Sequence, residues 1–207
     1  MQPSPDYPLH SVTGLLLAGG RGSRLGNCDK GLHLFRGRPL TAWVCERLQP
    51  QVAAVLINAN RNLDQYAQFG HAVCSDQISG FAGPLAGLHA GLLQADTEFV
   101  LSVACDSPFI PLDLAARLYA TLSAQAADIA IAATREMGKS GLQPQPVFAL
   151  VRKHLAADLS LYLESGQSKA RLWMEGQRLA LCYFPESLAF TNINTEHELI
   201  LAEKYDA

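Results

Sequence analysis

The sequence predicts an α/β fold, with a single, doubly wound and mostly parallel sheet flanked by helices. Short apolar runs recur along the 207 residues, and stretches with helical patterns separate them. The runs do not alternate between polar and apolar residues, which is typical of strands buried on both faces of a parallel sheet. Strands that alternate with helices predict βαβ units and therefore a doubly wound sheet.

The first predicted strand is Val12–Leu17, which is apolar apart from Thr13 and Gly14. A shorter apolar patch lies at Ala72–Cys74. Runs of four to eight residues suit strands better than helices. The remaining predicted strands are Ala53–Ile57, Phe99–Ala104, Asp128–Ala133, Val147–Val151 and Leu179–Phe184.

The predicted helices carry apolar residues at helical spacing, and two of them begin with proline, which is tolerated in the first turn. In one of these two, Leu112, Ala115, Leu118 and Leu122 recur at helical spacing. The predicted helices are Leu40–Leu48, Pro84–Gln94, Pro111–Leu122, Arg152–Glu164, Lys169–Glu175 and Thr195–Lys204.

No internal repeat, low-complexity segment or linker interrupts this pattern. We therefore expect residues 1–207 to form one domain, in which residues 1–11 are a loose leader before the first strand. A chain of this length can bury a sizeable core without disulfides or structural metals.

The composition excludes several classes of protein. Hydrophobic residues make up 49% and charged residues 17% of the chain, which is a globular composition. A net charge of −3 lacks the basic excess that non-specific nucleic-acid binding needs. The five cysteines have no CxxC spacing, so we expect reduced thiols in a cytoplasmic protein. No apolar run approaches the roughly 18 residues of a membrane helix.

Polar residues follow each predicted strand, at the edge where ligands bind in open α/β sheets. Because parallel strands end at the same edge, we expect these residues to converge on one site. The first strand leads through Leu17, Ala18 and Gly19 into a glycine-rich loop with Arg21, Arg24 and Lys30; Asn58, Asn60, Asp76 and Asp106 follow the later apolar segments.

The glycine-rich loop has the chemistry of a phosphate site. Glycines at positions 19, 20, 22 and 26 let backbone N–H groups approach an anion, while the basic side chains add positive charge. The loop matches neither the P-loop nor the dinucleotide fingerprint. The alternative is a glycine-rich surface turn with charged decoration.

The polar residues beyond the loop each allow two interpretations. Asp106 ends a buried strand, where a carboxylate can hold Mg²⁺ together with substrate phosphates, but Asp-Ser-Pro is also typical of a turn. Asn58, Asn60 and Asp76 have the hydrogen-bonding groups to bind a base or ribose, or to close turns. Cys105 and His89 are interpreted as packed residues without a catalytic role.

Several stretches together resemble one family. LAGGRGSRLGNCDKG, NANR, GPLAG, CDSPFIP, QPVFAL and NINT occur in this order and span nearly the whole chain after residue 11. In these stretches the chain is similar to the molybdenum cofactor guanylyltransferases, the MobA family, among the nucleotidyltransferases with a Rossmann-like sheet. The chain departs from the usual pattern at Leu25, at Gly26-Asn27 and at Glu196.

The resemblance implies that GTP and molybdopterin react to give molybdopterin guanine dinucleotide and pyrophosphate, with Mg²⁺ as cofactor. Molybdopterin's phosphate, already ionised near neutral pH, would attack the α-phosphorus of GTP without a general base. Transient contacts with other molybdenum cofactor biosynthesis or acceptor proteins are expected, and none with nucleic acid or membranes.

The resemblance also implies roles for individual residues. Arg24, Lys30 and Asp106 are the expected catalytic residues, because they would neutralise the charge of two approaching anions. The implied nucleotide-binding residues are Leu17, Ala18, Gly19, Lys30, Asn58, Asp76 and Asp106; Asp106 is also the implied metal ligand, and Asn192 and Asn194 are the implied acceptor-binding residues.

Three alternatives remain at this stage. The first is a cytidylyltransferase for the same pterin. The first loop of such an enzyme has a sequence like LAAG, where this chain has Ala18-Gly19-Gly20. The missing methyl group at Gly19 leaves room for a purine and favours GTP. A sugar-phosphate or isoprenoid nucleotidyltransferase shares the loop but not NANR and GPLAG. A non-catalytic nucleotide-binding module would not need both a metal carboxylate and a phosphate-facing lysine.

Overall fold

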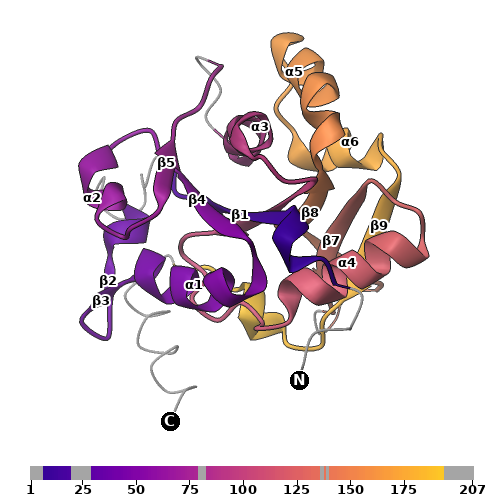
Figure 1. The fold of residues 1–207 in the computed structure, drawn as a ribbon. Coiled ribbons are helices and arrows are strands. Elements are labelled where there is room, and N and C mark those ends of the chain that lie inside the picture. The colour runs from indigo at the N-terminus through magenta and orange to yellow at the C-terminus, as the bar shows by residue number, and fades with distance from the viewer. Residues whose placement is uncertain (1–6, 20–28, 79–82, 136–137, 139, 194–207) are drawn as a thin grey trace.

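The computed structural model describes residues 7–19, 29–78, 83–135, 138 and 140–193. Its main sheet has seven strands, and every neighbouring pair is parallel except the two pairs that involve β8 (Figure 1). The predicted fold class is confirmed. In spatial order the strands are β5 (Ala72–Cys74), β4 (Ala54–Asn58), β1 (Val12–Leu17), β6 (Phe99–Ala104), β8 (Gln143–Arg152), β7 (Ile129–Thr134) and β9 (Leu179–Tyr183).

Two strands of the sheet are buried along their whole length, and a third nearly so, as the unbroken apolar runs predict. Every residue of β6 and β7 is buried, and in β1 only the last residue is partly exposed. The edge strands β5 and β9 mix buried with exposed residues. Burial on both faces follows from helices that cover both sides of the sheet.

Helices cover both faces of the sheet (Figure 1), and a hydrophobic core lies on each face. One face packs against α1 (Leu40–Leu48) and α4 (Leu114–Ala124), and the other against α3 (Pro84–Gln94), α5 (Ala156–Glu164) and α6 (Ala170–Glu175). Successive residues of β1 contribute to opposite cores, because side chains alternate along a strand. No helix in the described part of the chain is long and apolar enough to span a membrane.

The start of α4 differs from the prediction. The helix begins at Leu114, and its predicted first residues form a turn in which the Leu114 N–H donates to the Pro111 carbonyl. Leu112 lies in this turn and is 62% exposed, whereas Ala115, Leu118 and Leu122 lie in the helix and are fully buried.

Several short elements have no counterpart in the predicted pattern. They include α2 (Leu63–Ala67) and a two-stranded hairpin of β2 (Leu34–Phe35) and β3 (Arg38–Pro39). β8 begins at Gln143, before the predicted strand at Val147. The predicted helix at residues 195–204 lies outside the described residues. Short 3₁₀ helices cover Leu9–Ser11, Lys30–Leu32, Gln49–Gln51, Lys153–Leu155 and Ser187–Phe190.

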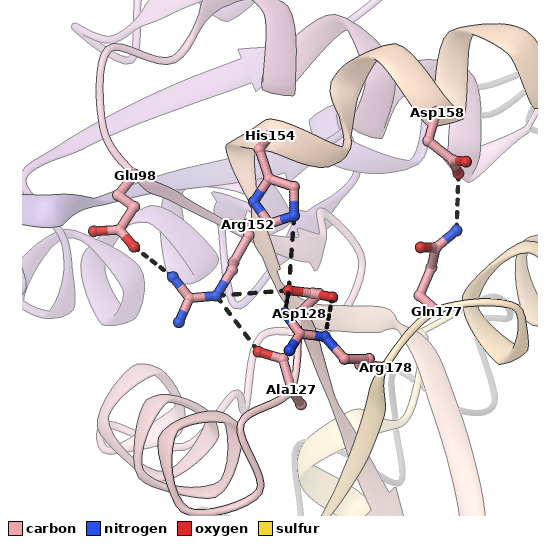
Figure 2. A network of polar contacts seen from close by, with 8 residues as sticks. All are labelled: Glu98, Ala127, Asp128, Arg152, His154, Asp158, Gln177 and Arg178. Atoms are coloured by element: carbon pink, nitrogen blue, oxygen red, sulfur yellow. Dashed lines mark hydrogen bonds and ion pairs between the residues drawn. The ribbon is translucent and has the colours of Figure 1, made fainter.

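A network of charged side chains lies at the amino ends of the parallel strands (Figure 2). Asp128 directly precedes β7, and the Arg178 guanidinium binds both of its carboxylate oxygens, at 2.7 and 2.6 Å. Arg152 and His154 approach the same carboxylate within 3.9 and 3.7 Å, and Arg152 also binds Glu98. This network ties the starts of β6, β7 and β9 to the end of β8.

Candidate functional site

The carboxyl ends of β1, β4, β5 and β6 lie side by side. Leu17 pairs with Asn58 on one side and with Ala104 on the other, and Asn58 also pairs with Cys74. Backbone bonds continue past the strand ends, since the Ala18 N–H donates to the Asn58 carbonyl at 2.8 Å. The sheet register therefore brings the polar residues that follow these strands to one edge, as the sequence predicts.

A network of two asparagines around Asp76 forms one half of this edge. Asn58 Nδ2 donates to Asp76 Oδ1 at 3.0 Å, and Asn60 Nδ2 donates to Asp76 Oδ2 at 2.8 Å. The Asp76 N–H returns a bond to Asn60 Oδ1 at 3.0 Å. Asn58 is buried, so this network fixes the orientation of its amide and of the half-buried carboxylate.

Two glycines pack directly against this network. A Cβ atom on Gly19 would lie 2.9 Å from Asn60 Nδ2 and 3.3 Å from Asn58 Oδ1. A Cβ atom on Gly87, in α3, would overlap Asn58 Oδ1 and the Leu17 side chain. At Gly87 the buried Asn58 amide leaves no room for a side chain, whereas a methyl group at Gly19 would displace the exposed Asn60 amide from the network. The GPLAG stretch serves close packing of α3 on the sheet through Gly87.

The other half of the edge contains an ion pair between Lys30 and Asp106. Lys30 Nζ lies 3.1 Å from Asp106 Oδ2, and the two side chains are 24% and 8% exposed. The Asp106 carbonyl accepts the Ile193 N–H at 2.8 Å. The structure thus joins the residue after β6 to the residue that follows the glycine-rich loop.

Asn192 lies beside the same strand end. Ser107 Oγ donates to Asn192 Oδ1 at 2.8 Å, and Ser107 is fully buried. A cavity of about 330 Å³ adjoins this contact, and its lining residues come from the start of β8 and from the segment after β9. The lining residues are Gln145, Pro146, Val147, Phe148, Phe190, Thr191 and Asn192.

Cys105 and His89, interpreted from the sequence as packed residues, are both buried. Cys105 is buried, and burial, with the nearby Asp106 and Asp29, raises the pKa of its thiol well above the ordinary value. A buried thiol of this kind is a poor nucleophile. Burial also lowers the pKa of His89, which keeps this buried imidazole neutral at pH 7.

The structure brings together Leu17, Ala18, Gly19, Asn58, Asp76, Lys30, Asp106 and Asn192 at one edge of the sheet. Arg21, Arg24 and Asn194 lie outside the described residues. The sequence reasoning missed Asp29, Tyr66 and Ser107, which hold site residues in place. Asp29 directly precedes Lys30 and Ser107 directly follows Asp106, so their positions in the sequence could have pointed to them. No local sequence pattern distinguishes Tyr66.

Comparison with known proteins agrees with this geometry. Residues 14–180 match the family model described as MobA-like NTP transferase domain. A molybdenum cofactor guanylyltransferase from Ralstonia pickettii is 48% identical over 93% of this chain and 96% of its own length. One from Ralstonia nicotianae is 49% identical over the same shares of the two chains.

Solved structures show the same fold at lower sequence identity. Molybdopterin-guanine dinucleotide biosynthesis protein A from Archaeoglobus fulgidus superposes with a TM-score of 0.72 at 24% identity, over 93% of this chain and 97% of its own. 4-Diphosphocytidyl-2C-methyl-D-erythritol synthase from Anaerococcus prevotii gives a TM-score of 0.72 at 15% identity, over 95% and 98%. The chain belongs to the MobA-like NTP transferase family and is a nucleotidyltransferase.

Proposed function

We propose that this nucleotidyltransferase is a molybdenum cofactor guanylyltransferase, which transfers GMP from GTP to molybdopterin and releases pyrophosphate. Relatives with that name are 46–49% identical to the chain over 91–93% of its length. The observation that carries the proposal is the placement of the Lys30–Asp106 pair beside the Asn58–Asp76 network at one sheet edge.

The Asn58–Asp76 network is the proposed site for the guanine nucleoside. A carboxylate offers about four lone-pair sites, and the two asparagine amides use two of them. Asp76 therefore keeps acceptor capacity for N–H or O–H groups of a nucleoside. Leu17, Ala18 and Gly19 border the network, and we assign them to the nucleoside together with it.

Lys30 and Asp106 form the proposed phosphate end of the site. The molybdopterin phosphate attacks the α-phosphorus of GTP, a new P–O bond forms, and the bond to pyrophosphate breaks. Both reactants are anions, so positioning and charge neutralisation dominate the rate. The Lys30 ammonium is a point charge on a flexible stem, which suits contact with a departing pyrophosphate. Arg24, outside the described residues, is assigned the same charge-neutralising role.

Asp106 is the proposed ligand for Mg²⁺. Among the described residues, no group of three His, Cys, Asp or Glu side chains forms a metal site by itself. The shielded Asp106 carboxylate nevertheless fits Mg²⁺, which is commonly held by one or two carboxylates together with substrate phosphates. When bound, the ion supplies positive charge to the triphosphate oxygens.

The acceptor is proposed to bind on the Asn192 side of the edge. Asn192 lines the cavity and is bonded to Ser107, the residue after Asp106, so a molecule in the cavity would lie on the side of the proposed phosphate end. Asn194 follows in the same segment and is assigned to the acceptor with it. Transient contacts with other proteins of cofactor biosynthesis, and a cytoplasmic location, stay predictions of the sequence.

A panel of nucleotides tests the proposal. The purified protein is incubated with Mg²⁺, molybdopterin and either GTP, CTP, ATP or UTP, and pyrophosphate and dinucleotide are both measured. We expect product with GTP alone, and no pyrophosphate when molybdopterin is left out. Dinucleotide formation with CTP in preference to GTP would contradict the proposal.

A further inference from the structure

Asp29 carries a buried carboxylate that the proposed reaction does not use. Its side chain is 5% exposed, and both oxygens have partners from the segment that follows β4. Oδ1 accepts the Tyr66 hydroxyl at 2.5 Å, and Oδ2 accepts Asn62 Nδ2 at 3.0 Å and lies 3.5 Å from Arg61 Nε. Donors on both oxygens fix the orientation of the carboxylate.

Asp29 begins a short bridge, residues 29–31, across the carboxyl end of β1. In the sheet β1 lies between β4 and β6. Asp29 binds residues 61–66, which follow β4, whereas Lys30 pairs with Asp106, which follows β6. The bridge therefore connects the loops on the two sides of β1. Asp29 binds the loop after β4, and Lys30 binds the loop after β6.

The third residue of the bridge limits how the bridge can move. A Cβ atom on Gly31 would lie 2.5 Å from the Tyr66 hydroxyl and 2.6 Å from Thr41 Oγ1, so the backbone is wedged against buried groups. Tyr66 is itself fully buried, and burial, together with its bond to Asp29, raises the pKa of its phenol. The hydroxyl thus stays a hydrogen-bond donor to Asp29 at neutral pH.

We propose that Asp29 is a positioning residue, which anchors the bridge through Tyr66, Asn62 and Arg61 so that the Lys30 ammonium points toward Asp106 and the nucleotide phosphates. The proposal rests on the proposed function for the identity of the ligand. Asp29 does not touch the nucleotide; its effect on phosphate binding passes through Lys30.

Removal of the charge at Asp29 tests this arrangement with a small change of shape. In Asp29→Asn the amide oxygen can keep the bond from Asn62 only if its NH₂ faces Tyr66, whose hydroxyl must then accept instead of donate. The charge that strengthens the bonds from Tyr66, Asn62 and Arg61 is lost in either orientation, so the anchor is weakened. Tyr66→Phe is the milder variant, because it removes one donor and leaves the carboxylate in place.

The experiment measures binding of inorganic triphosphate and of GTP by calorimetry, in the wild type and in a Lys30→Ala background. We expect Asp29→Asn to weaken binding of both about tenfold and Tyr66→Phe about threefold, in line with loss of one charge-assisted hydrogen bond. Neither change should weaken binding further once Lys30 is alanine, because both act through its ammonium. Such non-additivity is the mark of coupled residues.

Tyr7→Phe provides the matched control. The Tyr7 hydroxyl also donates a 2.5 Å bond, to the Gln51 carbonyl, but away from the sheet edge that holds the site. The Tyr7→Phe substitution should leave the affinity for triphosphate unchanged. If Asp29→Asn does not fold, Tyr66→Phe alone decides the question.

Unchanged triphosphate affinity in the folded variants would overturn the proposal. An equal loss in the Lys30→Ala background would also overturn it, since Asp29 would then act without Lys30. Inorganic triphosphate carries no base, so this outcome is independent of which nucleotide the enzyme uses. Failure of guanylyl transfer with intact coupling to triphosphate would reject the proposed function and leave the positioning role standing.

Discussion

The two ends of the sheet each hold a buried aspartate beside basic side chains, but the basic groups differ in kind. At the amino end, the Arg178 guanidinium binds both oxygens of Asp128, with Arg152 close by (Figure 2). At the carboxyl end, Asp106 pairs with the Lys30 ammonium through one oxygen. A guanidinium fork fixes a carboxylate, whereas a lysine is a mobile point charge.

This difference separates a structural carboxylate from one that a ligand can use. Hydrogen bonds from Arg178 lower the pKa of Asp128, and the charges of Arg178, His154 and Arg152 act in the same direction. Both oxygens of the Asp128 carboxylate therefore bind protein partners. Asp106 pairs with Lys30 through Oδ2, and it lies at the edge where α/β sheets bind ligands.

The largest effect on activity is expected from Asp106→Ala. Loss of the proposed metal ligand should reduce guanylyl transfer by about 10³-fold, because charge stabilisation at the phosphates is lost. The measurement is pyrophosphate release over a Mg²⁺ titration. If the Asp106→Ala variant kept the Mg²⁺ dependence of the wild type, Asp106 would not be the metal ligand.

Lys30→Ala should lower guanylyl transfer by about 10²-fold, because a charge-assisted contact to phosphate contributes roughly 1.5–3 kcal/mol. Lys153→Ala is the control from the other end of the sheet, where Lys153 Nζ donates to the Ala95 carbonyl. Initial rates of the two folded variants are compared at saturating molybdopterin. Full activity of Lys30→Ala would refute the phosphate role.

Gly19→Ala should reduce the use of GTP about tenfold, an effect of roughly 1.4 kcal/mol. The added methyl group would lie 2.9 Å from Asn60 Nδ2 and must push this amide away from Asp76. We expect GTP use to fall relative to CTP, and the ratio of kcat/KM values for the two nucleotides measures this. An unaltered ratio would reject the role of Gly19 in nucleotide choice.

Asp128→Asn should leave guanylyl transfer unchanged and lower the free energy of unfolding by about 1 kcal/mol, because hydrogen bonds to a charged group are lost and the Arg178 partner is largely exposed to solvent. Folding lowers the pKa of Asp128, so the carboxylate stabilises the wild type above the unfolded-state pKa, which is about 3.9. The stability difference should be full at pH 7 and disappear as the pH falls through the folded-state pKa. Denaturant unfolding at several pH values checks this, and a difference that grows in acid would contradict it.

The sequence predicted the main sheet well because most of its signals are local. Apolar runs such as Phe99–Ala104 are strands wherever both faces are covered, and the convergence of Asn58, Asp76 and Asp106 follows from parallel topology alone. The start of α4 was predicted at Pro111 instead of Leu114, because proline near a helix start fits the turn before the helix as well as its first residue.

The contacts that hold the site could not be predicted in the same way. The bond between Asp29 and Tyr66 joins residues 37 apart, and the bond between Ser107 and Asn192 joins residues 85 apart. No periodicity or spacing encodes such pairs, because they depend on which loops the sheet order brings together. For the same reason, the sequence named Lys30 as a phosphate ligand without identifying what orients it.

The most direct test compares Asp106→Asn with Asp128→Asn in one preparation, with guanylyl transfer and thermal unfolding measured on each. The account predicts that Asp106→Asn loses guanylyl transfer and keeps the melting temperature of the wild type. Asp128→Asn should keep guanylyl transfer and melt at a lower temperature. Equal loss of activity in the two variants, or full activity of Asp106→Asn, would contradict the assignment of the carboxyl end of the sheet as the reacting site.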